Sequence, residues 1–228
     1  MIRRLIPLSV AAALLALSPA LPADKDKDSG KDDVAGFTPL FNGKDLTGWQ
    51  VAPGGKKEVW TVDNGLLVTK SGGGGYLMTD KEYSDFEIRL DFKMSEGGNS
   101  GVGLRAPLEG DPAYTGMEIQ LLDDVWHKEH LKDLKPVQLT GSIYGVVPPS
   151  KDALKPVGEW NGIDITAKGR QVTVVLNGVT TVDANLDDHK DAFKAHPGLT
   201  RDKGHLGLQS HSNRVEFRKI YVKDLSGS

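Results

Sequence analysis

Hydrophobic and polar residues alternate along much of the chain after Phe37. The clearest run is FEIRLDFKM, residues 86–94, in which apolar side chains stand at every second position and charged side chains stand between them. A period of two is typical of a β-strand with one buried face, because successive side chains point to opposite sides of a sheet. A strand with one solvated face usually belongs to an antiparallel sheet. We therefore predict a half-buried antiparallel strand over residues 86–94.

A second alternating region, residues 99–124, predicts two strands joined by a turn-rich loop. One face of these strands is apolar, with residues Val102, Leu104, Met117, Ile119 and Leu121. The opposite face carries Arg105, Glu118 and Gln120, which we expect to lie together on the outer side if the strands are neighbours. Glycines between them leave room for a ligand against the backbone. The competing interpretation is an ordinary solvated face.

Turn signals divide the rest of the chain into further short strands. Asn64-Gly65 and Asn177-Gly178 each lie between apolar runs and predict hairpins. The segment HLGLQSH, residues 205–211, repeats the earlier pattern, with leucines on one face and Gln209 and His211 on the other. A phase change between Phe217 and Ile220 indicates a β-bulge in the last strand.

Helical character is confined to one short segment, residues 125–138, which Pro136 brings to an end. Its His127 and His130 stand three residues apart, a spacing that one helical turn could use for a metal. A polar surface loop is the preferred interpretation, because no HExxH spacing or third ligand is evident. The polar segment 184–204 predicts a long loop that places His189 and His196 at the surface.

The fold class follows from many short strands separated by Gly, Asn and Pro turns, without regular helices between them. The chain contains 27 glycines among 228 residues, which favours tight turns. No internal repeat marks the blades of a propeller. We predict an all-β protein, a single antiparallel β-sandwich over residues 37–226, with the jelly roll as the favoured version.

The N-terminus predicts export. Residues 1–23 combine Arg3 and Arg4 with an apolar run and a small-residue end, the pattern of a signal peptide. An uncleaved anchor is the alternative, but Pro19 and Pro22 interrupt a run that is short for a spanning helix. A charged flexible leader is expected over residues 24–36. We therefore expect a periplasmic or secreted protein with no stable membrane insertion after cleavage.

Charge and composition narrow the class of partner. The net charge is −3, so the chain lacks the basic footprint of a nucleic-acid binder. There are no cysteines, hence no disulfides. The glycine run 72–75 is not followed by the lysine of a P-loop, and residues 24–30 only mimic the start of a calcium loop. We expect no cofactor, although a divalent metal stays possible, and nothing in the sequence indicates an oligomeric state.

Six short motifs resemble one known family, the 3-keto-disaccharide hydrolases, formerly catalogued as a domain of unknown function. They occur in order and span nearly the whole chain after Phe37: LFNGKDLTGW (40–49), NSGVGLR (99–105), GMEIQLLD (116–123), TGSIYG (140–145), EWNGIDI (159–165) and GHLGLQSH (204–211). The resemblance implies a concanavalin A-like jelly roll with its site on the concave sheet face. It also implies cleavage of glycosides whose glucose unit is oxidised at C3.

The resemblance carries the family's polar positions onto this sequence. They are Arg105, Glu118, Gln120, Asp123 and His211. The sequence departs from the family at Ser210, where an acidic residue often precedes the histidine. The role of each residue is not fixed by the resemblance.

Chemistry suggests roles for these side chains. A ketone at C3 acidifies the C2 hydrogen, so removing that proton lets the C1 substituent leave, and water can then add back. Such a site needs a base near C2 and donors near the C3 oxygen. Our hypothesis makes Glu118 or His211 the base and Arg105 the oxyanion stabiliser. Substrate hydroxyls would be held by further polar side chains: Asn99, Gln120, Asp123, Tyr144 and Gln209. A divalent ion on Glu118, Asp123 or His211 is a minority alternative.

Two other functions remain open at this point. A non-catalytic carbohydrate-binding module would use the same face, with Trp126, Tyr144 or Trp160 as a stacking platform, although Trp160 fits a core position better. A conventional glycosidase would need paired carboxylates. Glu118 and Asp123 differ in parity along the strand, so they point to opposite faces unless the strand ends between them.

Overall fold

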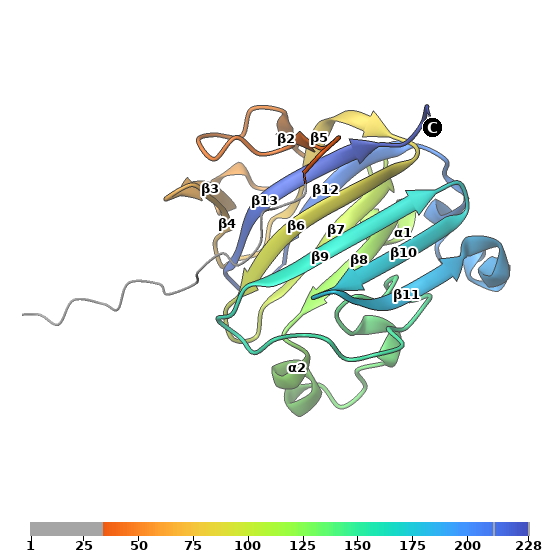
Figure 1. Cartoon of the computed structure of the whole chain (residues 1–228). Helices are drawn as coiled ribbons and strands as arrows, with labels where there is room; N and C mark the ends of the chain where they lie inside the picture. Colours follow the sequence, from red (N-terminus) through yellow and green to blue (C-terminus); the bar gives the residue numbers. More distant parts are fainter. Residues whose placement is uncertain (1–33, 212, 228) are drawn as a thin grey trace, which may run out of the picture. The chain divides into compact units, whose positions relative to one another are not determined.

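The computed structural model describes residues 34–211 and 213–227, and these form a sandwich of two antiparallel sheets (Figure 1). The predicted all-β jelly-roll fold is confirmed. The expected signal peptide, residues 1–23, and most of the expected leader, residues 24–36, lie outside the described residues.

The larger sheet has eight strands. Across the sheet they run β11 (Val179–Asn185), β10 (Gln171–Leu176), β9 (Asn161–Lys168), β6 (Phe86–Met94), β13 (Val215–Asp224), β4 (Leu66–Thr69) and β3 (Trp60–Asp63), and β1 (Thr38–Pro39) pairs with β13. Strand β6 is the predicted segment 86–94, and its residues alternate between buried and half-buried along the whole length.

The smaller sheet has five strands and carries most of the polar residues singled out above. Its order is β2 (Trp49–Val51), β5 (Gly75–Tyr83), β12 (Gly204–Ser210), β7 (Asn99–Ala106) and β8 (Met117–Leu122). Strands β7 and β8 are neighbours, with Gly101 opposite Gln120 and Gly103 opposite Glu118. The two strands of region 99–124 therefore pair as expected.

The core lies between the two sheets and contains the predicted apolar faces. In the smaller sheet these residues are at most 1% exposed: Val102, Leu104, Met117, Ile119, Leu121, Leu206 and Leu208. Because side chains alternate across a strand, the residues between them face away from the other sheet. This outward face of the five-stranded sheet is the surface on which the polar side chains gather.

The predicted turns and the bulge are also present. Asn64 and Gly65 have φ of 50° and 80°, and Asn177 and Gly178 have φ of 50° and 79°. Positive φ at both central residues is the signature of a type I′ hairpin turn. In β13 the register shifts between Arg218 and Tyr221, which confirms the bulge.

Helices are few and short in the described part of the chain. They are α1 (Pro112–Thr115) and α2 (Asp124–His130), with 3-10 segments η1 (Lys57–Val59), η2 (Pro136–Gln138), η3 (Leu186–Lys194) and η4 (Pro197–Thr200). Helix α2 ends at His130, well before Pro136. No helix among the described residues is long and apolar enough to cross a membrane.

The expected long loop at 184–204 is wrong in two respects. The segment contains η3 and η4, and the Asn185 side chain caps the first of them by accepting from Asp187 N. His196 is 7% exposed rather than on the surface, because its ring stacks on Tyr114 with centroids 5.0 Å apart. A polar composition therefore concealed short helices that pack against the sheet.

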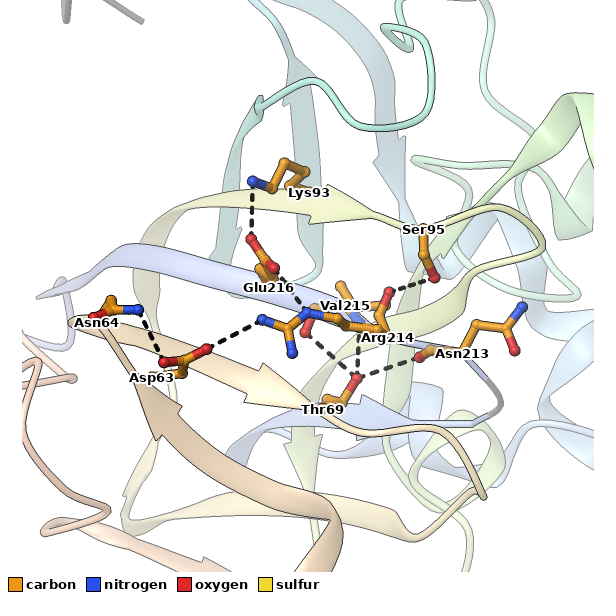
Figure 2. Close-up of polar contacts among 9 residues, drawn as sticks. All are labelled: Asp63, Asn64, Thr69, Lys93, Ser95, Asn213, Arg214, Val215 and Glu216. Atoms are coloured by element: carbon orange, nitrogen blue, oxygen red, sulfur yellow. Dashed lines mark hydrogen bonds and ion pairs between the residues drawn. The ribbon is translucent and has the colours of Figure 1, made fainter. Parts of the chain in front are cut away.

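The start of β13 is tied to β4, as Figure 2 shows. Thr69 Oγ1 accepts from Val215 N at 3.0 Å and lies 3.4 Å from Asn213 O, to which it donates. Asn213 Nδ2 donates in turn to Glu96 O at 2.7 Å. These bonds fix the chain shortly after His211, the last residue of the predicted polar strand face.

Candidate active site

A polar cavity of about 170 Å³ lies on the outward face of the five-stranded sheet. Strands β7, β8 and β12 supply its floor, and α1, α2 and the loops near η2 supply its walls. Its lining residues are mostly polar: Asn99, Asp111, Ala113, Tyr114, Glu118, Gln120, Leu122, His127, Leu131, Leu134, Gln138, Tyr144, Gln209 and His211. Six of the eight residues predicted for the site meet here: Asn99, Glu118, Gln120, Tyr144, Gln209 and His211.

Glu118 lies at the bottom of this cavity and is 2% exposed. Its Oε2 accepts from the Tyr76 hydroxyl at 2.7 Å and lies 3.4 Å from Gln209 Nε2, a second donor. Its Oε1 is buried and has no hydrogen-bond partner among the described residues. The carboxyl group crosses directly over Gly101, where a Cβ would collide with Oε1. One oxygen is therefore oriented by Tyr76, and the other is buried against Gly101 without a partner among the described residues.

Burial raises the pKa of Glu118 to about 8. The Tyr76 hydrogen bond opposes this rise, and the negative charge of Asp111 adds to it. Desolvation dominates because the carboxylate loses its water and gains no cation. A carboxyl group that titrates near pH 8 is a stronger base than an exposed glutamate, and its pKa lies near the pH at which it would work.

Tyr76 is a site residue that the sequence reasoning missed. It lies on β5, paired with Gln209 of β12, and its hydroxyl accepts from Gln209 Nε2 at 2.9 Å while donating to Glu118. Burial and the nearby Glu118 raise the pKa of Tyr76 well above its usual range, so it remains a donor. The available signal was the alternation of Tyr76 and Met78 with Leu77 directly after the glycine run.

The other predicted ligands form a rim around Glu118. Gln120 Nε2 donates to Asn99 Oδ1 at 3.3 Å. The Tyr144 hydroxyl accepts from Gln138 Nε2 at 3.2 Å, which leaves its own proton free to donate. His211 is exposed at the edge of the cavity. The rim thus offers several donors and acceptors suited to hydroxyl groups.

Arg105 does not lie in this cavity, and the expected grouping with Glu118 is corrected. Its φ is 49°, next to a register shift between β7 and β12, so a bulge turns the side chain away from the Glu118 face. The guanidinium is 0% exposed and donates to Ser84 O at 2.7 Å, Gly169 O at 2.8 Å and Asp85 Oδ1 at 3.2 Å. These partners leave it no role at the Glu118 cavity.

Asp123 also lies apart from Glu118. Strand β8 ends at Leu122, and Asp123 caps α2, with Oδ1 accepting from Trp126 N at 3.1 Å and Oδ2 accepting from Gly97 N at 2.9 Å. It lines a different cavity, of about 520 Å³. Its carboxylate is used to position α2, so Glu118 and Asp123 do not form the carboxylate pair of a conventional glycosidase.

The remaining aromatic and metal candidates fall into separate places. Trp126 lines the same 520 Å³ cavity as Asp123, and Trp160 is 9% exposed with Arg218 4.1 Å from its ring centroid. Ser210, at the position of the family's acid, is 3% exposed, and its Oγ has no partner among the described residues. Within residues 34–211 and 213–227, no three His, Asp or Glu side chains gather as a metal-binding group.

The fold and the site together define a class of protein: an antiparallel β-sandwich with a polar cavity on the outward face of one sheet. The sequence matches the model of one family, the 3-keto-alpha-glucoside-1,2-lyase-like domain, over residues 36–223. The chain belongs to this family, and the resemblance stated from its motifs is confirmed.

Relatives and solved structures agree with this assignment. A protein of Bacteroides thetaiotaomicron named 3-keto-disaccharide hydrolase is 27% identical over 233 residues, which cover 85% of this chain and 80% of that protein. Two structures from Parabacteroides distasonis, provisionally assigned to the glycosyl hydrolases, are similar throughout. The first is 33% identical with a TM-score of 0.74, covering 85% of this chain and 95% of its own. The second is 31% identical with a TM-score of 0.70, covering 83% and 99%.

Proposed function

We propose that this protein cleaves the glycosidic bond of 3-keto-glucosides and 3-keto-disaccharides by elimination followed by addition of water. Oε1 of Glu118 takes the proton from C2, and the electron pair left behind forms an enolate with the C3 oxygen. The enolate then expels the C1 oxygen, which leaves with a proton as the alcohol. Water adds to C1, a proton returns to C2, and the net reaction is hydrolysis.

The observation that carries this proposal is the state of the Glu118 carboxyl group. One oxygen is held by Tyr76, the other has no partner among the described residues, and the pKa is about 8. A general base needs a fixed orientation, one free lone pair and a pKa near the working pH. An unpartnered polar atom in a buried carboxyl group is also costly unless a ligand completes it.

The rim residues supply the other roles. Tyr144 and Gln120 are the donors that stabilise charge on the C3 oxygen. They take the role expected of Arg105, which lies outside the cavity. His211, at the edge of the cavity, gives a proton to the departing C1 oxygen in this proposal. Asn99 and Gln209 bind sugar hydroxyls.

The test is to incubate the protein with a 3-keto-glucoside in D2O and to follow sugar release and deuterium at C2 by NMR. The wild type is expected to release sugar and to incorporate deuterium, and kcat/KM is expected to rise with pH through about 8, since the ionised carboxylate is the base. Glu118→Gln is expected to lose both signals by a factor of about 10² to 10⁴. His211→Ala is expected to retain exchange and to lose release.

The outcomes separate the competing functions. Release without any deuterium at C2 would contradict the elimination route. Binding of both plain and 3-keto sugars with no product would favour a carbohydrate-binding module. A parallel reaction with chelator reports whether a divalent ion takes part.

We also propose that the protein works in the periplasm or outside the cell. The basis is the pattern of residues 1–23, two arginines followed by an apolar run and a small-residue end. N-terminal sequencing of the exported protein is expected to find a start near residue 24. An intact Met1 would contradict cleavage.

A further inference from the structure

A second hollow, of about 300 Å³, adjoins the Glu118 cavity. Its lining residues come from β5, β12 and the start of α1: Gly74, Gly75, Tyr76, Gly110, Asp111, Pro112, Gln209, Ser210 and His211. Three residues, Asp111, Gln209 and His211, line both hollows. The two hollows therefore adjoin at these three residues, which we call the shared edge.

Glycine backbone forms part of the wall of the second hollow. Three of its nine lining residues are glycines, and Gly75 and Gly110 have φ of 77° and 87°. Most side chains are strained at such positive φ values, so these positions favour glycine and expose bare backbone. The wall of the hollow is therefore main chain at these positions, and its amide and carbonyl groups face a ligand without an intervening side chain.

The shared edge carries hydrogen-bond acceptors that the hydroxyl groups of a sugar could donate to. Gln209 directs its Nε2 toward Tyr76 and Glu118, while its Oε1 is buried without a partner among the described residues. The Asp111 side chain accepts from Ala113 N through Oδ1, and a carboxylate can accept further bonds. A buried carbonyl oxygen without a partner gains most from a ligand that donates a hydrogen bond.

We propose that the second hollow binds the leaving sugar of a 3-keto-disaccharide. The inference rests on the proposed function, in which the C2 proton faces Glu118 in the first hollow. C1 is one bond away from C2, so the leaving oxygen lies at the shared edge beside His211. The sugar attached to that oxygen then extends into the second hollow, where Gln209 and Asp111 accept hydrogen bonds from its hydroxyl groups.

The test compares two substrates that share the oxidised ring but differ in leaving group, a 3-keto-disaccharide and a methyl 3-keto-glucoside. Pro112 lines only the second hollow and occupies the first position of α1, where glutamine is also tolerated. Pro112→Gln is expected to lower kcat/KM for the disaccharide about tenfold and to change it less than about twofold for the methyl glucoside. Gly75→Asn, the replacement best suited to positive φ, brings its Cβ to 3.3 Å from Gly55 Cα and, where thermal unfolding is unchanged, is expected to act in the same way.

Val125→Gln is the matched control, because Val125 is 66% exposed and lines only the separate 520 Å³ cavity. It is expected to leave both substrates unchanged. Equal effects of Pro112→Gln and Gly75→Asn on both substrates, in variants with wild-type thermal unfolding, would overturn the second subsite. Failure of the wild type to cleave either substrate would instead contradict the proposed function, so the two failures are distinguishable.

Discussion

Glu118 and Arg105 are both buried charged residues, on the adjacent strands β8 and β7, yet their surroundings are opposite. Arg105 is enclosed by acceptors, with two backbone carbonyls and the Asp85 carboxylate within 3.2 Å. Glu118 has one oxygen oriented by Tyr76 and another with no partner among the described residues. The alternation of residues predicts both side chains on the same outer face, but in the structure only Glu118 lies there.

The difference teaches how a buried charge can be assigned to folding or to function. A satisfied charge stabilises the arrangement of loops around it, because each partner would be costly to leave unpaired. A half-satisfied charge is a cost to the empty protein that a bound ligand can remove. This difference supports the proposal that Arg105 serves the fold and Glu118 serves the reaction.

The largest expected effect is the loss of stability in Arg105→Met. Removing the fully buried guanidinium takes this donor from the part-buried carbonyls of Ser84 and Gly169 and the cation from Asp85, and we expect the free energy of unfolding to fall by about 4 kcal/mol. Urea unfolding measures this. Arg214→Met, at a side chain that is 44% exposed, is the control and is expected to cost less than about 1 kcal/mol. A small loss in Arg105→Met would remove the contrast between the two regions.

The second expected effect is a pH-dependent gain of stability in Glu118→Gln. The unfolded chain loses this proton near the ordinary pKa of 4.5, whereas the folded protein keeps it to about 8. Unfolding therefore releases a proton in this window, and wild-type stability falls as the pH rises. Urea unfolding of both proteins from pH 5 to pH 9 is expected to show a difference that grows by roughly 4 kcal/mol.

The exposed Glu109→Gln serves as its control, and its difference from wild type is expected to stay constant over the same pH range. A constant difference for Glu118→Gln as well would show that Glu118 is already ionised in the folded protein.

Local patterns were sufficient to predict the fold. The strand at 86–94, the two Asn-Gly hairpins and the apolar faces of β7, β8 and β12 all follow from alternation and turn chemistry, which act between near neighbours in sequence. The short helices within 184–204 did not follow, because their packing against α1 depends on contacts distant in sequence.

The site was only partly predictable for the same reason. Glu118, Gln120, Gln209 and His211 meet because strand parity brings them to one face. The predicted position of Arg105 was wrong because a single residue of positive φ interrupts that alternation. The sequence of β7 contains no pattern that predicts this change. The caps and bulges that redirect side chains depend on the three-dimensional register of β7, β8 and β12.

The third expected effect tests the position of Glu118 without changing its chemistry. A Cβ at Gly101 collides with the Glu118 carboxyl group, whereas a Cβ at Gly103 meets only Tyr76 at 3.5 Å and the Gly207 backbone at 3.6 Å, ordinary contacts. We expect Gly101→Ala to lower kcat about a hundredfold by displacing the base, and Gly103→Ala, on the same strand, to lower it only a few-fold. Equal activities would mean that the carboxyl position is unimportant. Steady-state kinetics on a 3-keto-glucoside measures both.

The smallest expected effect comes from Asp111→Asn. Asp111 contributes least among the causes that set the pKa of Glu118, after burial and the Tyr76 hydrogen bond, and its negative charge raises that pKa. Asparagine keeps the cap on Ala113 N, since its side-chain oxygen accepts as the carboxylate does. The variant therefore removes the charge while the local backbone is preserved, and the pKa of Glu118 falls.

We expect the rising limb of kcat/KM to move to lower pH by a few tenths of a unit. Activity near pH 7 then increases slightly, because more of Glu118 is ionised. A shift of the limb to higher pH would mean that another group controls the profile.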